Sequence, residues 1–398
     1  MTTFGRPAIG WFMLSEADRA SANRYLSQIS ADGTRDELGF APIHFAFADR
    51  FFPGTSVQHA QLRYVFFVAW SYQELLARTA GQQFSLEELV KIERRFSLRL
   101  MKTIEIHENS GISGWTKYRD GELPEVRAST IYWAALRQWG MMSRLTGANG
   151  SPTEGQLRAM WPHMAIRADG EKGGSSIANL FEGLPDAPPG WANKTGKLDF
   201  TLRHREARYL RCKWKSAGER PGPPLLSRLV EAGVAPESLW SPEVSRVADP
   251  SERVALVVAE RAAALACIAR AAHSALVEAK RNEERGRNDA LHANAFPGLR
   301  DRYRDTALEL DLAALQAETA IDGRLSSFIA EVMGWLAERG SIEAISRTIE
   351  LRERDLKDSR AFLLNEKRRR DWRKSVAEPL DYRWPVVRRM IESVRAVS

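Results

Sequence analysis

Residues 251–285 read SERVALVVAERAAALACIARAAHSALVEAKRNEER, and this stretch decides the fold class. Its apolar side chains recur with a seven-residue rhythm at Val254, Val258, Leu265, Ile268, Ala272 and Leu276. Such a rhythm is typical of a helix that packs along another helix. We therefore predict that Ser251 opens the longest helix of the chain, that it runs to about Arg285, and that its apolar series contacts a neighbouring helix.

Helical patterns continue on both sides of this stretch. Upstream, the apolar spacing predicts helices from Thr55 or Ser56 to about Arg78, from Leu86 to Ile106, and from Ser129 to Trp139. Downstream, helices continue to about Asn365. Only Lys197 to Phe200 has a strand-like pattern. The fold class is therefore mostly α and multi-helical, with two or three subdomains and little or no sheet.

Breaker residues between 167 and 200 divide the chain. Gly173-Gly-Ser-Ser176 and Leu184-Pro-Asp-Ala-Pro-Pro-Gly190 are typical of a linker or an irregular surface. We predict three parts: an N-terminal helical domain (1–166) with a possible helix-turn-helix-like end, an irregular linker plus a basic helix (167–245), and a C-terminal helical domain with a basic, aromatic tail (246–398).

Composition excludes several classes of protein. The chain has 398 residues, a net charge of +7 and 44% hydrophobic residues, which is typical of a globular protein. Two distant cysteines and scattered histidines indicate neither a disulfide framework nor a metal motif. No phosphate-binding loop or dinucleotide fingerprint is present, so we expect no cofactor and no metal. The absence of a signal peptide or a membrane-length apolar run favours a cytoplasmic location and no membrane partner.

The C-terminal tail carries most of the excess positive charge. Residues 347–398 hold 15 Lys and Arg against nine acids, which is +6 of the chain's +7. Cations neutralise phosphates, and the aromatics Trp372, Tyr382 and Trp384 could stack on bases. We therefore predict nucleic-acid contacts at Lys367, Arg368, Arg369, Arg370, Arg373, Lys374, Arg383, Arg388 and Arg389. The alternative is a solvated helix face, with Leu380, Tyr382, Trp384 and Val387 docking the tail onto the core.

A second basic segment spans residues 203–215. It holds six Lys or Arg and one acid, Glu206. On a helix, Tyr209, Leu210 and Trp214 fall towards the core, and the basic side could lie along a phosphate backbone. The predicted contacts are Arg203, Arg205, Arg208, Arg211, Lys213 and Lys215. The alternative is an amphipathic helix whose long side chains cover apolar surface.

Three further groups of residues carry weaker signals. The segment Ala128–Met141 is similar to the second helix of a helix-turn-helix, in which Ser129, Thr130 and Trp133 would point outward and Arg137 would lie near the DNA backbone. Glu105-Ile-His-Glu-Asn109 could supply acid–base or metal-binding groups, although such triplets are usually surface caps. Asp49, Ser56, His59 and Arg63 are better interpreted as caps and core hydrogen bonds than as a catalytic triad.

Several multi-residue segments together resemble a bacterial family catalogued only as a domain of unknown function. They are Gly10-Trp11 with Ser15, Thr34-Arg-Asp-Glu-Leu-Gly39, Ala46-Phe-Ala-Asp49 before Phe52-Pro-Gly-Thr-Ser56, Arg63-Tyr64 with Phe67-Val-Ala-Trp70, Ser129-Thr-Ile-Tyr-Trp133 with Trp139-Gly140, and Leu380-Asp-Tyr-Arg-Trp-Pro385. The resemblance implies a helical cytoplasmic protein of mobile gene clusters, beside helicases and phospholipase-D-like proteins. His59, Gln61 and Ala69 depart from the family pattern, which has glutamine, arginine and proline there.

Three functions remain open. The first is a non-catalytic nucleic-acid-binding or adaptor subunit of a bacterial antiviral defence or DNA-processing complex. Its partners would be nucleic acid, most simply DNA, and a helicase or a phospholipase-D-like protein. The second is a metal-dependent nuclease, and the third is a helical scaffold that binds a protein partner.

Overall fold

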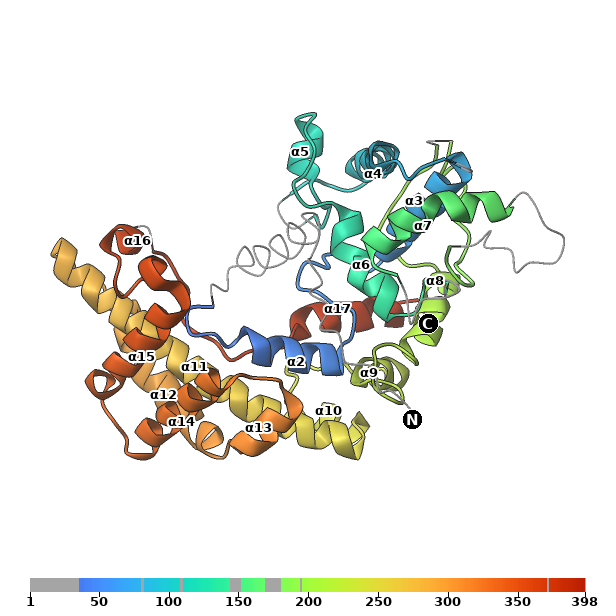
Figure 1. Cartoon of the computed structure of the whole chain (residues 1–398). Coiled ribbons are helices and arrows are strands. Elements are labelled where there is room, and N and C mark those ends of the chain that lie inside the picture. Colours follow the sequence, from blue (N-terminus) through green and yellow to red (C-terminus); the bar gives the residue numbers. More distant parts are fainter. Residues whose placement is uncertain are drawn as a thin grey trace, which may run out of the picture. The chain divides into compact units, whose positions relative to one another are not determined.

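The structure is a computed structural model that describes residues 36–79, 82–107, 110–143, 152–168, 180–193, 195–370 and 372–397 (Figure 1). These residues form sixteen α-helices and one 3-10 turn, and they contain no strand. Their one β-type pairing is an isolated bridge between Met142 and Phe181. The mostly α prediction is therefore confirmed. The predicted strand at Lys197 to Phe200 is wrong, because no neighbouring chain pairs with that segment.

The N-terminal half of the described chain contains nine short or medium helices. They are α2 (Ala41–Phe51), α3 (Tyr64–Arg78), α4 (Leu86–Met101), α5 (Trp115–Arg119), α6 (Ala128–Gln138), α7 (Glu154–Ala168), α8 (His204–Trp214), α9 (Leu225–Ala232) and α10 (Pro242–Val247), followed by the long α11 (Pro250–Arg285). α3 packs against α4 and α6, and α8 packs against α9. Large aromatic side chains, among them Phe67, Trp70 and Tyr132, fill this core.

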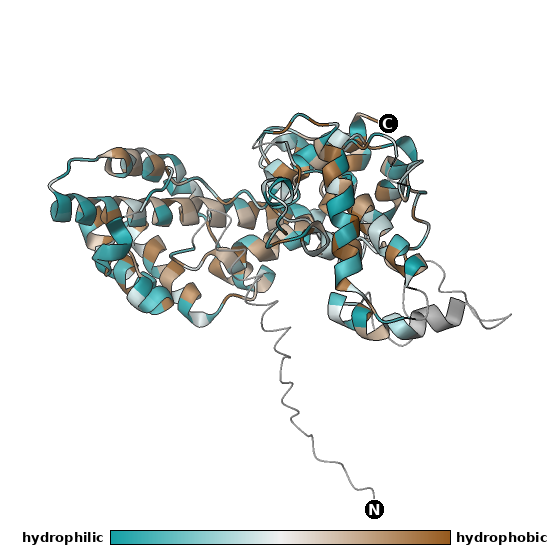
Figure 2. Ribbon diagram, turned by 90° about the horizontal axis from the view of Figure 1, so that it is seen from above, coloured by the Kyte–Doolittle hydropathy of each residue, from teal (hydrophilic) through white to brown (hydrophobic). Residues whose placement is uncertain are grey.

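α11 is the central helix of the C-terminal half. α12 (Leu291–Leu308) packs along it, and it also contacts α13 (Leu312–Glu318), α14 (Gly323–Ala337), α15 (Ile342–Lys357) and α16 (Glu366–Arg370). The 3-10 turn η1 (Asp358–Arg360) follows α15, and α17 (Trp384–Arg395) ends the fold. Hydrophobic and hydrophilic positions alternate along most of these ribbons, as amphipathic helices require (Figure 2).

The long helix matches its predicted range, but its packing differs from the prediction. Asp249 and Glu252 form a capping box around the first turn, which begins at Pro250, and Gly286 ends the helix with a φ of 60°. Nearly every residue from Ala262 to Ala275 is buried, so α11 is covered on all sides rather than along one seam. Val254 is 61% exposed, because the buried face of the first turns runs through Ala255, Leu256 and Ala259 instead.

Two other helices are shorter than predicted. α3 begins at Tyr64, because the preceding residues form turns whose backbone is held by side chains such as Thr55 and His59. α4 ends at Met101, five residues before Ile106. The Ser85 side chain accepts the Glu88 amide at 3.3 Å, which is one half of a capping box. The carboxylate half is not formed, because Glu88 pairs with Lys91. The predicted breakers at Gly173–Ser176 lie outside the described residues.

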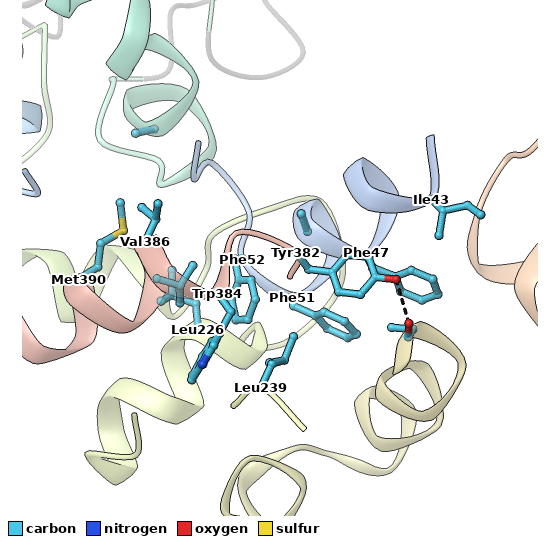
Figure 3. Packing of buried hydrophobic residues seen from close by; sticks show 14 of the residues in the cluster. Ile43, Phe47, Phe51, Phe52, Leu226, Leu239, Tyr382, Trp384, Val386 and Met390 are labelled. Atoms are coloured by element: carbon cyan, nitrogen blue, oxygen red, sulfur yellow. Dashed lines mark hydrogen bonds between the residues drawn. The ribbon is translucent and has the colours of Figure 1, made fainter. Parts of the chain in front are cut away.

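An extended segment, Trp372–Arg383, runs antiparallel along α11, and we call it the strap. Three hydrogen bonds show this direction. Arg281 donates to the carbonyl of Trp372 (2.9 Å), Cys267 donates to that of Ala377 (3.7 Å), and the Tyr382 hydroxyl donates to that of Ala259 (2.8 Å). Successive residues of the strap thus bond to earlier and earlier residues of α11. Figure 3 shows Tyr382 beside Phe47 and Phe51, with its hydroxyl bonded to α11. The strap thus belongs to the folded core.

The strap ends in a left-handed turn that starts α17. Tyr382 and Arg383 have φ angles of 50° and 67°, a conformation that costs non-glycine residues on the order of 1 kcal/mol each. The buried hydrogen bond of Tyr382 and the ion pair of Arg383 with Asp49 (2.6 Å) offset this cost. The predicted divisions at residues 166 and 245 stay predictions; the contacts of Glu37–Ser398 form one compact unit.

Candidate nucleic-acid interface

The short helix α16 presents three cations to solvent at the carboxyl end of α11. Lys367, Arg368 and Arg370 are exposed, and no carboxylate of the described residues forms an ion pair with any of them. The Arg368 guanidinium lies 5.5 Å from the centre of the Phe362 ring, so its stem covers apolar surface while its charge stays in water. These three side chains are in the position that the sequence predicted for phosphate contacts.

Arg369 has the opposite orientation. Only 5% of it is exposed, and Nε donates to a Glu284 carboxylate oxygen at 3.0 Å, while its other nitrogens bond to Glu284 and to the Phe362 carbonyl. A bidentate arginine–carboxylate pair of this kind fixes position as well as charge. The structure therefore removes Arg369 from the predicted phosphate contacts, because its donors hold α16 against α11.

Two cations that the sequence analysis missed lie beside α16. Arg285 and Arg287 are exposed at the end of α11, and Arg287 lies 4.0 Å from Asp289. Their stretch appeared neutral in sequence because it also contains Glu283 and Glu284. In the fold, Glu284 is bonded to Arg369, so it does not neutralise its neighbours. The signal was thus present, but only tertiary pairing makes it visible.

We define the basic cluster as the exposed cations that surround the end of α11. Arg373 belongs to it, because its side chain is exposed and donates one hydrogen bond to the Trp372 carbonyl at 2.8 Å. The members are Arg285, Arg287, Lys367, Arg368, Arg370 and Arg373.

The remaining predicted cations of the tail are mostly used in ion pairs. Lys374 donates to Glu37 at 2.7 Å, and Arg383 is 4% exposed and bonded to Asp49. Arg388 lies 2.6 Å from Glu237 and 3.0 Å from Glu392. Arg389 is exposed and forms no ion pair with a described residue. Lys374, Arg383 and Arg388 are therefore structural pairs, and they are no longer candidates for phosphate contact.

The predicted stacking of bases on the tail's aromatics is wrong. Trp372, Tyr382 and Trp384 are 3%, 0% and 4% exposed. Trp384 donates to the carbonyls of Pro236 and Glu237, both at 3.2 Å, and lies against Leu226 in Figure 3. Their apolar rings are worth more in the core than on the surface, as the alternative reading of the tail predicted. The candidate surface on the tail thus offers charge without these three aromatic rings.

α8 is amphipathic, as predicted, and its cations divide into two groups. Arg203 pairs with Asp199 (2.9 Å), Lys213 with Glu182 (3.2 Å) and Lys215 with Glu231 (2.7 Å). Arg211 is half-buried with a partner in the fold. Arg205 and Arg208 are exposed and form no ion pair with a described residue. Only these two remain as candidates for phosphate contact on α8.

Comparison with known proteins places the chain in a family. A family model, DUF6361, matches residues 7–396, which is nearly the whole chain. The chain belongs to DUF6361, a family of unknown function. No curated protein and no solved structure matches it. The family is therefore shown and agrees with the resemblance to a domain of unknown function, whereas the gene-cluster association stays a proposal.

The helix-turn-helix prediction for this DUF6361 chain fails on the orientation of α6. Ser129 is fully buried, and its amide donates to the buried carboxylate of Glu93 at 2.7 Å. Trp133 packs on Tyr72, with ring centres 5.4 Å apart. Only Thr130 and Arg137 are exposed as expected. The upstream helix, α5, has five residues, so the residues meant to read DNA serve the core instead.

The polar groups around the Phe52-Pro-Gly54 turn are core hydrogen bonds, as predicted. His59 is buried, with its ring stacked on Tyr132 at 4.4 Å, Nδ1 near the Ser56 amide (3.3 Å) and Nε2 near the Ile131 carbonyl (3.1 Å). Burial lowers the pKa of His59 to about 4, so the ring is neutral at pH 7.

Arg63 is buried beneath this turn and joins α3 to α8. It donates two bonds to the Glu206 carboxylate (2.9 and 2.8 Å) and two to Asp199, one to the carbonyl (2.9 Å) and one to the carboxylate (3.1 Å). The family departures His59 and Ala69 are both buried, Ala69 in the interior of α3, where proline would break the helix.

The remaining candidates give no catalytic constellation. Glu108 and Asn109 of the Glu105–Asn109 group lie outside the described residues. Within the described ranges, no three His, Cys, Asp or Glu side chains are placed to hold a metal ion. In the same ranges, no helix combines the length and the apolar character that crossing a membrane requires.

Proposed function

We propose that this DUF6361 protein is a non-catalytic nucleic-acid-binding subunit whose basic cluster contacts the phosphate backbone. The observation that carries the proposal is the set of three exposed cations without a carboxylate partner on α16, Lys367, Arg368 and Arg370. They lie beside the exposed Arg285 and Arg287 at the carboxyl end of α11. Cations that lack carboxylate partners are the ones that can release counterions from a polyanion.

The burial of the tail's aromatics supports a particular mode of binding. Without exposed rings beside the cations, stacking on unpaired bases has no platform. Backbone contacts alone position a protein but carry no sequence information. We therefore expect binding that is independent of sequence, strongly dependent on salt, and at least as good for duplex as for single-stranded DNA.

The test is fluorescence polarisation of a labelled DNA duplex across a salt series with the Lys367→Gln/Arg368→Gln/Arg370→Gln variant. Arg369 is left in place because it holds the helix. Each lost phosphate contact should flatten the slope of log K against log salt by about 1, so we expect a reduction of about 3. The matched control removes three exposed arginines elsewhere, Arg302→Gln/Arg324→Gln/Arg347→Gln, and should leave the slope nearly unchanged.

Equal losses in both triple variants would mean that only net charge matters and that the α16 surface is no interface. An unchanged slope in the α16 variant would remove the proposal. Retained binding after Arg205→Gln/Arg208→Gln would further show that α8 contributes little.

We also propose, from the family resemblance alone, that the protein acts in bacterial antiviral defence or DNA processing. An enzyme of the same gene cluster, a helicase or a phospholipase-D-like protein, would then supply the catalysis. Affinity purification from the native host tests this partner. Recovery of no such enzyme under conditions that preserve complexes would contradict it.

A further inference from the structure

A surface hollow of about 390 Å³ opens next to the basic cluster, where α11 turns into α12. Its wall combines the end of α11, the start of α12 and the first residues of the strap. Four cations and two carboxylates line it: Arg281, Arg287, Arg373, Lys374, Glu278 and Asp289. The hollow therefore carries a net positive charge.

The two carboxylates are already engaged within the protein. Glu278 accepts the amides of His292 and Ala293, both at 2.9 Å, and so caps the first turn of α12. Asp289 pairs with Arg281 at 2.7 Å. These bonds hold the acids in place and reduce what they can offer to the other cations of the hollow.

Two of the four cations are exposed and keep most of their donors for a ligand. Arg281 is bonded to Asp289 and to the Trp372 carbonyl, and Lys374 is bonded to Glu37. Arg287 is exposed and 4.0 Å from Asp289, which is beyond hydrogen-bonding distance. Arg373 is exposed and uses one nitrogen for the Trp372 carbonyl. Guanidinium forks match the oxygens of a phosphate group.

The back of the hollow is rigid. Trp372 is 3% exposed, with the Arg281 guanidinium 5.4 Å from its ring centre and the His292 ring 4.9 Å away. Burial lowers the pKa of His292, so this ring adds no charge near pH 7. A buried wall with two exposed arginines beside it favours a small, highly charged group over a long polyanion.

We propose that this hollow binds a phosphate monoester, with Arg287 and Arg373 as its ligands. A monoester carries nearly two negative charges at pH 7, whereas an internal phosphodiester carries one. A terminal phosphate can also enter a surface hollow end-on, so the strand does not have to pass through it. The source is the 5′-phosphorylated end of a nucleic-acid strand or a free nucleotide; the strand-end source rests on the proposed function, and the free-nucleotide source does not.

The experiment compares fluorescence polarisation of two labelled duplexes at fixed salt, identical except for a 5′-phosphate or a 5′-hydroxyl, with AMP and inorganic phosphate as competitors. We expect the phosphorylated duplex to bind about tenfold tighter, as two charge-assisted hydrogen bonds allow. The Arg287→Gln/Arg373→Gln variant should lose this preference. The Lys367→Gln/Arg368→Gln variant removes the same charge. It should bind both duplexes more weakly and keep the preference for the phosphorylated one.

Each outcome decides between the two proposals. Equal affinity for both duplexes, with no competition by AMP or phosphate, overturns the hollow as a phosphate site while backbone binding stands. A third outcome is that neither duplex binds, whereas calorimetry detects AMP binding to the wild type and none to the Arg287→Gln/Arg373→Gln variant. This would support the hollow as a phosphate site and overturn the proposed function. A preference that survives in this variant overturns the assignment of its ligands.

Discussion

Glu353 is the residue on which the turn before α16 depends. Its carboxylate is fully buried and accepts the amides of Phe362 at 2.7 Å and Leu363 at 2.9 Å, with His273 Nε2 3.3 Å away. Burial opposes ionisation, but His273 and the two amides outweigh it and lower the pKa of Glu353 below its ordinary 4.5. The ionised form is thus the one that the fold requires.

Glu353→Gln should lower the free energy of unfolding at pH 7 by about 2–4 kcal/mol, because an amide nitrogen replaces one acceptor of a buried N–H. Denaturant unfolding measures it. The matched control on the same helix is Glu350→Gln, which breaks half-exposed pairs with Lys280 and Arg347 and should cost less than about 1 kcal/mol.

The pH dependence of the same variant follows from its lowered pKa. A carboxyl whose folded pKa lies below its unfolded pKa stabilises the fold above the unfolded value, and this contribution disappears as the pH falls through the folded value. The gap between wild type and Glu353→Gln should therefore shrink below pH 4.5. A gap that stays constant down to pH 3 would contradict the role of the charge.

His59 should make the protein less stable in mild acid. Its pKa falls from 6.5 to about 4 on folding, because burial penalises the imidazolium. Between these two pH values the unfolded chain binds a proton at His59 that the folded protein does not bind. The free energy of unfolding is therefore highest above pH 6.5 and decreases towards pH 4, by up to about 3 kcal/mol. His59→Gln should flatten this part of the unfolding profile.

At the scale of the element, α16 is a helix that cannot stand alone. Five residues are too few for an isolated helix, so its order comes from tertiary contacts. Arg369 provides them by bonding to Glu284 and to the Phe362 carbonyl. One arginine of the run Lys-Arg-Arg-Arg thus places the other three cations on the surface.

Arg369→Lys tests this role at constant charge. A lysine cannot form the bidentate bond to Glu284, so α16 should detach and its amides should exchange faster with deuterium. Arg368→Lys, one residue earlier and exposed, is the matched control and should exchange like wild type. We expect the difference in residues 362–370 and nowhere else. Equal protection in both variants would show that α16 does not depend on Arg369.

At the scale of the whole molecule, the strap and α17 join segments that are far apart in sequence. The strap lies along α11, Arg383 pairs with Asp49 on α2, and Trp384 donates a hydrogen bond to the segment after α9. In sequence the basic tail resembles a dispensable extension. In the structure it is part of the compact Glu37–Ser398 unit and holds distant segments of it together.

Deletion of residues 371–398 should consequently abolish cooperative unfolding. The deletion removes six buried apolar side chains of α17, each worth about 1.5–3 kcal/mol, a total comparable to the whole stability of a domain. Thermal melting followed by near-ultraviolet circular dichroism measures this. Deletion of residues 397–398 alone is the control; of the described contacts it removes those of Val397 with His204 and Val394 and the partial burial of the Val397 side chain. A cooperative melt near the wild-type temperature in the long deletion would contradict this role of the tail.

The amino-acid sequence by itself determined the helical class, the range of α11 and the position of α6. Helical periodicity, on which these predictions rest, is a local signal that needs no partner. The sequence also located the basic segments, because charge is a property of composition. The tail's alternative interpretation, that its aromatics dock on the core, was likewise available from sequence.

Only the tertiary structure decided which cations remain free. Arg369 and Arg383 are chemically identical to Arg368 and Arg389, but the first two face carboxylates and the others face water. Ion pairs between residues distant in sequence depend on the packing of whole helices, as does the burial of Ser129, which overturned the helix-turn-helix prediction. The residue type determines the charge of a side chain, but the tertiary fold determines which residue it pairs with.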